Sequence, residues 1–157
     1  MTDEADKAGK AKVTQVVDEL IVRLNDISPD DGYFNSLPAP VMDDDPALYF
    51  DEHTKLPCIG IRNISDRITS QSRGATNQIR TVEIVAYVER QPDGRANQDK
   101  LLQDIYRTVF RPESLKFDGL IVEIEAGEAQ LDDVELGTKI LPIYLPITLT
   151  YNTLNWR

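Results

Sequence analysis

The stretch Ile143-Tyr144-Leu145-Pro146-Ile147-Thr148-Leu149-Thr150-Tyr151-Asn152 alternates between apolar and mostly polar side chains. Its odd-numbered positions carry isoleucine, leucine and tyrosine, and its even-numbered positions carry mainly proline, threonine and asparagine. Successive side chains of a strand point to opposite faces, so this pattern predicts a β-strand with one buried face. The content of β-branched and aromatic residues agrees with that prediction. We expect the rest of the chain to cover the apolar face of this strand.

Two prolines predict how this strand is paired. Backbone N–H groups alternate sides along a strand, so even-numbered residues address one neighbour and odd-numbered residues the other. Pro142 and Pro146 lack this donor, and both belong to the even-numbered side. A neighbouring strand on that side is therefore expected to pair well only from Thr148 onward, while the other side is free for pairing along its full length.

The other predicted elements follow from the spacing of apolar residues. A second alternating run covers residues 80–90, and residues 56–64 and 120–125 form two further apolar runs of strand length. Amphipathic helices are predicted over residues 13–27 and 97–110, because apolar residues recur there at intervals of three and four. The order of these elements predicts an α+β fold, with a mainly antiparallel sheet of about four strands and two amphipathic helices packed on one face.

The length predicts a single domain, residues 1–157, with three segments outside the regular elements. Residues 1–12 are polar and predict a flexible N-terminal lead. Residues 30–55 form a long loop rich in acidic residues and proline. Residues 65–80 are predicted to form a mobile polar arm between two strands, because Ile68 is the only large apolar residue in the first fourteen of them.

Composition and charge exclude several classes of function. The net charge is −10 and the pI is about 4.5, which argues against general or sequence-specific nucleic-acid binding and against docking on an anionic membrane. Cys58 is the single cysteine, so no intrachain disulfide is possible. Residues 1–55 carry 13 acids and 5 bases, whereas residues 56–95 carry 6 arginines and 4 acids. This bipolar distribution suits self-association, and ordinary solvated charge is the alternative.

No catalytic constellation emerges from the sequence. His53 is the single histidine, and neither it nor Asp51 has partners at metal-ligand spacing. A nucleophilic Cys58 would need a base, for which only His53 is available. Glu123 and Glu125 share one face of a short strand, where wet surface carboxylates explain them as well as acid–base chemistry does. The sequence therefore predicts no catalytic residue, no metal site and no cofactor. A small hydrolytic or ligand-binding protein that uses His53, Cys58 and Asp51 is the alternative.

Arginines of the polar arm and an acidic triplet are the candidate interaction residues. Arg67, Arg73 and Arg80 give local positive charge to an acidic protein. This pattern indicates either a partner-binding loop that becomes ordered on assembly or a polar hairpin loop. The triplet Asp43-Asp44-Asp45 is similar to part of a calcium loop, but the sixth position is Leu48 where an EF-hand needs glycine.

The order of these elements resembles the tail terminator (minor tail, or tail-completion) proteins of long-tailed bacteriophages and prophages. The resemblance rests on the leading helix at residues 13–27 and on the strand at residues 56–61, which follows a proline-rich loop. It continues through the strand at residues 81–88 and the helix at residues 97–110, and ends with residues 145–151. It spans nearly the whole chain and is one of order and pattern.

The resemblance implies an α+β structural subunit without enzymatic activity. Such a subunit is expected to close into a hexameric ring that caps the tail tube, stops its polymerisation and joins it to the head–tail connector protein. The implied partners are further copies of the chain, the tail tube protein and the connector, with DNA passing through the ring lumen. The implied location is the virion tail or neck, after assembly in the host bacterial cytoplasm. Another ring protein of the neck or tail, of head–tail joining or tail-tube-like type, is the near alternative.

The resemblance also suggests roles for the candidate interaction residues. The arm with Arg67, Arg73 and Arg80 is expected to face the ring lumen or the tube. The acidic segments are expected to contact neighbouring subunits or the connector, and they include Asp43, Asp44 and Asp45.

Overall fold

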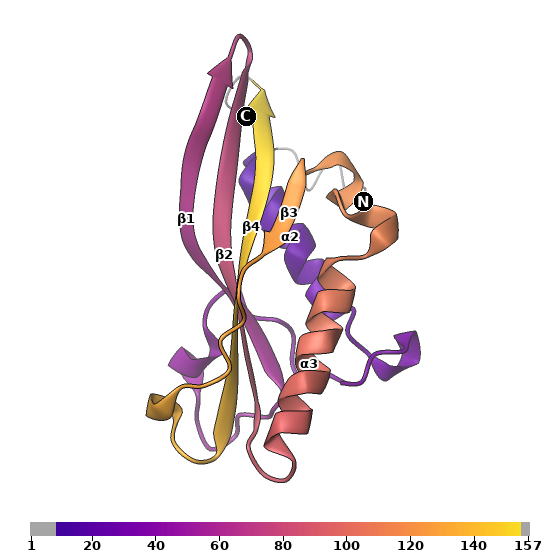
Figure 1. Cartoon of the computed structure of the whole chain (residues 1–157), viewed down its shortest axis with the longest axis vertical. Helices are drawn as coiled ribbons and strands as arrows, with labels where there is room; N and C mark the ends of the chain where they lie inside the picture. Colours follow the sequence, from indigo (N-terminus) through magenta and orange to yellow (C-terminus); the bar gives the residue numbers. More distant parts are fainter. Residues whose placement is uncertain (1–8, 155–157) are drawn as a thin grey trace.

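A computed structural model describes residues 9–154 of the chain (Figure 1). Its helices are α2 (Lys12–Asn25) and α3 (Gly94–Val109), and its strands are β1 (Cys58–Ser72), β2 (Ala75–Glu89), β3 (Glu123–Ala126) and β4 (Ile140–Leu154). Short 3-10 turns connect them: η1 (Pro29–Asp31), η2 (Pro46–Tyr49), η3 (Pro112–Ser114), η4 (Phe117–Gly119) and η5 (Val134–Leu136). Residues 1–8 of the predicted N-terminal lead lie outside the described part.

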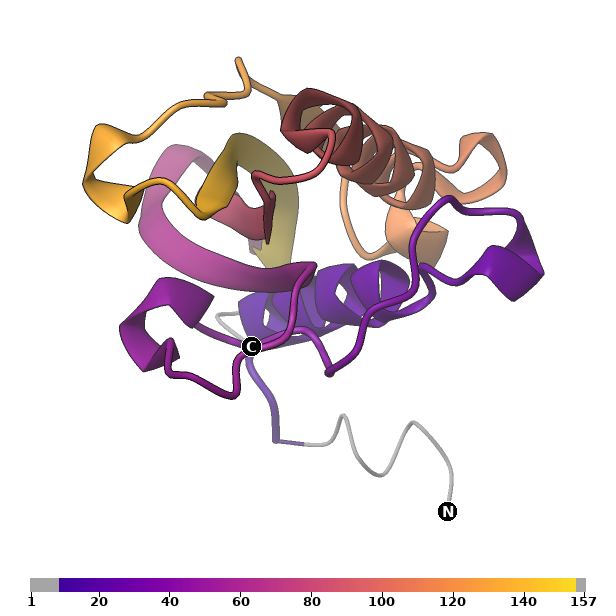
Figure 2. The same ribbon diagram turned by 90° about the horizontal axis from the view of Figure 1, so that it is seen from below.

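The strands form one antiparallel sheet in the order β1-β2-β4-β3. Figure 2 shows both helices beside this twisted sheet, with the loops that contain η2 and η5 on the side away from α3. The two helices contact each other as well as β4, and α3 also contacts β2. The predicted α+β fold, with four strands and two helices, is therefore confirmed.

Strand β4 lies in the interior of the sheet, and its pairing follows its prolines. It pairs with β2 along its whole length, whereas β3 pairs with it only between Ile147 and Thr150. Between Pro142 and Pro146, the edge of β4 on which these prolines lack an N–H has only an isolated bridge, between Tyr144 and Gln130. Pro146 itself contributes only its carbonyl oxygen, which accepts from the Gly127 N–H at 2.8 Å. The predicted asymmetry of pairing is thus confirmed.

The hydrophobic core lies between the sheet and the two helices. All five odd-numbered residues of β4 from Ile143 to Tyr151 are buried, as the alternation predicted. They pack with the core-facing residues of β1 and β2 and with one stripe from each helix. The central members of the core are Val16, Leu20 and Leu24 of α2, Leu101, Ile105 and Val109 of α3, Val82, Ile84 and Ala86 of β2, and Ile59 and Ile61 of β1.

The strands are longer than the helices can cover. β1, β2 and β4 have 15 residues each, which corresponds to about 50 Å at about 3.4 Å per residue. The helices have 14 and 16 residues, which corresponds to about 21 and 24 Å at 1.5 Å per residue. The outer ends of the strands therefore rise beyond the helices (Figure 1). We call this part, residues 64–79 with residues 150–154 of β4, the projecting sheet.

The prediction of a loop-like arm at residues 65–80 is wrong. β1 continues to Ser72, the chain turns at Arg73 and Gly74, and β2 begins at Ala75. Gly74 has a φ of +83°, a conformation that glycine adopts without steric cost. The hairpin is paired throughout, with register shifts between Asn63 and Ser65 and between Ile68 and Ser70. A strand without a buried apolar face carries no apolar alternation, so its sequence resembles that of a polar loop.

The acidic loop at residues 30–55 is held against β1. Met42 forms a parallel bridge with Gly60, in which its N–H donates to Ile59 and its carbonyl oxygen accepts from Ile61, each at 3.0 Å. A Cβ atom at Gly60 would overlap the carbonyl oxygen of Asp44. The glycine is therefore needed for the close approach of this loop.

The alternation of β4 is tested by one substitution at two positions of the same strand. Leu145 is fully buried, so Leu145→Ala is expected to lower the free energy of unfolding by about 2–5 kcal/mol. Leu154 is 59% exposed, so Leu154→Ala is expected to change it by less than about 0.5 kcal/mol. Urea denaturation followed by circular dichroism measures both. Equal losses for the two variants would contradict the assignment of faces.

Candidate functional site on the projecting sheet

The projecting part of β1 is exposed to solvent on both of its faces. Every residue from Arg62 to Ser72 is exposed, in contrast to the buried residues 59–61 that precede them. Ile64 and Ile68 are 49% and 48% exposed. β1 is also the edge strand of the sheet. This combination leaves half-exposed apolar side chains beside an open strand edge, which is the setting in which sheets acquire partners.

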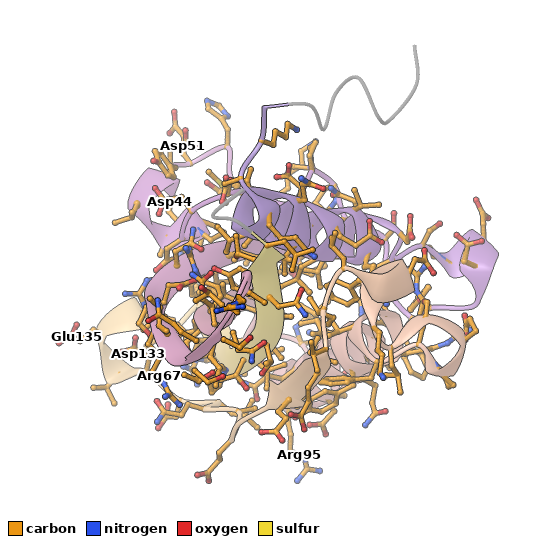
Figure 3. The ribbon with its side chains drawn as sticks, turned by 90° about the horizontal axis from the view of Figure 1, so that it is seen from above. Asp44, Asp51, Arg67, Arg95, Asp133 and Glu135 are labelled. Atoms are coloured by element: carbon orange, nitrogen blue, oxygen red, sulfur yellow. The ribbon has the colours of Figure 1, made fainter. Side chains whose placement is uncertain are left out.

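The structure separates the three arginines that the sequence grouped together. Arg67 lies opposite Ile79 on the outer face of the sheet, which is the face away from the helices. Arg80 lies opposite Asp66 on the face that the helices cover farther down, and Arg73 lies in the turn at the tip. Seen from above the tip, Asp44 lies on the opposite side of the projecting strands from Arg67 (Figure 3). The arginines therefore do not form one positive patch.

Arg80 belongs to a polar network that joins three strands. The Asp66 carboxylate accepts from Arg80 Nε at 3.1 Å, from Gln78 Nε2 at 3.0 Å and from the Tyr151 hydroxyl at 2.7 Å. The Thr153 hydroxyl donates to Gln78 Oε1 at 2.7 Å. Burial and the hydrogen bond to Asp66 raise the pKa of Tyr151, so its hydroxyl remains a donor. The network holds the three strands together beside the first turns of α2, where the projecting sheet begins.

Asp43 of the acidic triplet and Arg80 of the predicted arginines lie beside the same surface hollow. Asp43 and Arg80 line the same hollow of about 140 Å³, between the first turns of α2 and residue Asn63 of β1. Arg80 also donates to Asn63 Oδ1 at 2.9 Å. Asp43 is exposed, so of the triplet it is the residue whose carboxylate is most available to a partner.

The other two members of the triplet have structural roles. Asp44 accepts from the Tyr49 hydroxyl at 3.0 Å. Asp45 caps η2 by accepting from the Ala47 N–H at 2.9 Å, and it also accepts from the Tyr87 hydroxyl at 2.8 Å. These bonds fasten the acidic loop to the outer face of the sheet.

The lower half of the outer face is covered by loops, whereas its upper half is bare. Phe50 packs edge-on against Tyr87 with ring centroids 5.0 Å apart, and Tyr87 packs against Tyr144 at 6.2 Å. The Tyr144 hydroxyl donates to Asp133 at 2.7 Å, and this bond lowers the pKa of that carboxyl. Above these contacts the outer face carries small and polar side chains, such as Thr81, Thr148 and Thr150, together with Ile79, and Arg67 lies at its β1 edge.

Two glutamates lie on this face at the opposite edge of the sheet, and the sequence pattern predicted only that they share one face of a short strand. Glu123 and Glu125 of β3 lie opposite Thr150 and Thr148 of β4, which places them on the outer face. Both are exposed. The neighbouring Glu125 raises the pKa of Glu123, through a hydrogen bond between the two side chains and through charge repulsion.

The groups of the hydrolytic alternative are not arranged as a catalytic site. The His53 side chain is 84% exposed and lies 3.4 Å from Glu52. Burial and the charge of Asp45 raise the pKa of the Cys58 thiol to about 12, whereas an activated cysteine needs a lowered pKa. Within residues 9–154, no group of three or more histidine, cysteine or acidic residues could hold a metal ion. Neither of the described helices is long and apolar enough to span a membrane.

Comparison with known proteins gives one match. A family model described as Bacteriophage Tail Tube Terminator Protein matches residues 8–137, which include both helices and the strands β1, β2 and β3. No curated protein sequence matches the chain.

The different roles of the two faces are tested at adjacent positions of β1. Asp66→Ala leaves Arg80 and Tyr151 without their acceptor, so it is expected to lower the free energy of unfolding by about 1–3 kcal/mol. Arg67→Ala removes an exposed side chain and is expected to change it by less than about 0.5 kcal/mol. Chemical denaturation of both variants measures the difference. A larger loss for Arg67→Ala would show that the faces are assigned the wrong way round.

Proposed function

This chain belongs to the bacteriophage tail tube terminator family, and from that premise we propose that it closes into a hexameric ring on the end of the tail tube. In this position the ring stops the addition of further tube subunits and offers its other side to the head–tail connector protein. The chain is then a structural component of the virion tail or neck, assembled in the host bacterial cytoplasm. DNA passes through the lumen of the ring.

The exposed edge of the projecting sheet is the main structural support for this proposal. It presents eleven consecutive exposed residues of an edge strand, from Arg62 to Ser72, with two half-exposed isoleucines among them. An open edge of this kind invites uncontrolled pairing unless it is covered. A closed ring covers the same patch on every subunit and leaves no free end. Ring closure therefore accounts for a surface that a lone subunit would expose.

The two ends of the molecule differ in a way that fits two different partners. The hairpin end carries Arg67 and Arg73, whereas the loops with η2 and η5 at the opposite end carry acidic residues (Figures 1 and 3). Each end can therefore face a different protein, with the tail tube on one side and the connector on the other. The overall charge of −10 keeps free subunits apart and favours passage of DNA over its binding.

The capping role is tested by the length of tail tubes. Tubes assembled from purified tube protein in the presence of this chain are expected to stop growing and to carry extra density at one end. Tubes assembled without it are expected to continue growing. Negative-stain electron microscopy measures the length distribution, and native mass spectrometry of the end complex counts the copies.

A suitable control is the Val22→Ala variant, which alters an exposed residue of α2 outside the projecting sheet and should cap as the unchanged chain does. The capping role would be ruled out if tube lengths were the same with and without the chain. A count other than six would contradict the hexameric ring alone.

A further inference from the structure

One row of residues crosses the whole sheet and ends in opposite charges. Arg67 of β1 lies opposite Ile79 of β2, Ile79 opposite Thr150 of β4, and Thr150 opposite Glu123 of β3. All four side chains therefore lie at the same height on the outer face. The sheet thus has a cationic group at one edge and an anionic group at the other, in register with each other.

Each charged residue at the ends of this row has a half-exposed apolar neighbour in the chain. Ile68 follows Arg67 in β1 and is 48% exposed. Val122 precedes Glu123, is also 48% exposed, and is placed by its N–H, which donates to Thr150 at 2.7 Å. The two edges therefore carry opposite charges in one row, and each also has a half-exposed apolar side chain next to its charged residue.

The charged groups of this row have no ionic partner in the described part of the chain. Within residues 9–154, no ion pair involves Arg67, Glu123 or Glu125. Two other arginines of the same hairpin are paired, Arg62 with Glu83 at 2.7 Å and Arg80 with Asp66 at 3.1 Å. The two glutamates repel each other on the short strand β3, and a cation placed beside them would relieve that repulsion.

A closed ring brings these two edges together at the same height. Cyclic symmetry relates subunits by rotation without a rise along the axis, so points at equal height meet when the strands run along that axis. The strands of the sheet alternate in direction, and β1 and β3 are therefore antiparallel to each other. A β1 edge beside the β3 edge of the next copy continues this alternation.

We propose that the contact between neighbouring copies in the ring joins the β1 edge of one copy to the β3 edge of the next. In this contact Arg67 lies between Glu123 and Glu125 of the neighbouring copy, and Ile68 packs against its Val122. Each of the two edges therefore binds another copy of this chain. The inference rests on the proposed ring and specifies its interface.

Reversal of charge tests the pairing. Arg67→Glu places a carboxylate beside two others, and Glu123→Arg places a second arginine beside Arg67. Each single variant is expected to need at least about tenfold more protein to cap tail tubes, because like charges at a contact are strongly unfavourable. The double variant, with both reversals, is expected to recover most of the capping. Cosedimentation with tail tubes measures the concentration required.

Arg95→Glu is the matched control for the single reversal. Arg95 is exposed in the first turn of α3 and lies away from both edges of the projecting sheet (Figure 3). It changes the net charge by the same amount and is expected to cap normally. Equal loss in Arg95→Glu and Arg67→Glu, or a double variant as weak as the single ones, would overturn the proposed contact.

Crosslinking separates this inference from the ring itself. In a Cys58→Ala background, Arg67→Cys combined with Glu123→Cys is expected to give a ladder of multimers on tail tubes with a short bis-maleimide, while each cysteine alone gives at most dimers. Rings that form and cap without such a ladder would overturn the edge contact but leave the proposed function intact. Failure of the unsubstituted chain to form rings on tubes would overturn both.

Discussion

The strands of this sheet are about twice as long as the helices that cover it, and this difference divides the molecule into two parts. Three strands of about 50 Å are paired along their whole length, whereas helices of about 21 and 24 Å cover only their lower part. The apolar alternation of β4 ends in Tyr151 where this cover ends, and the residues beyond it are mainly polar. The sheet therefore has one part that folds by its own core and one part that must be stabilised in another way.

The two faces of the projecting sheet are stabilised in different ways. On the face that continues the core, Asp66 gathers hydrogen bonds from β2 and β4, so that part is stabilised within the chain. On the outer face, Arg67 and Glu123 end one row at opposite edges without an ionic partner among the described residues. Adjacent residues of one strand thus serve the stability of the subunit and its association with others. Because the outer face contributes little to folding, its charges can be selected for assembly.

The sequence was sufficient wherever a local pattern reports burial. The alternation of β4, the spacing of apolar residues in both helices and the missing donors of Pro142 and Pro146 predicted the fold and the pairing of its central strand. Residues 65–80 were misassigned because a strand without a buried face is specified by its partner strands and carries no local signal. The face of Arg67 was equally unpredictable, since the register shift between Asn63 and Ser65 reverses which residues of β1 face the core side. The face of Arg80 follows from the alternation of β2, in which it lies on the same side as Val82 and Ile84.

Hydrogen exchange along β1 shows whether assembly covers the projecting sheet. We expect amides of residues 62–72 to exchange rapidly in the free chain wherever they face the open edge, and to slow markedly once the chain is bound to the end of a tail tube. Amides of residues 59–61, already buried in the core, serve as the internal reference and should not change. Unchanged exchange over residues 62–72 in tube-bound chains would contradict a role of the projecting sheet in assembly, because its edge would still be open.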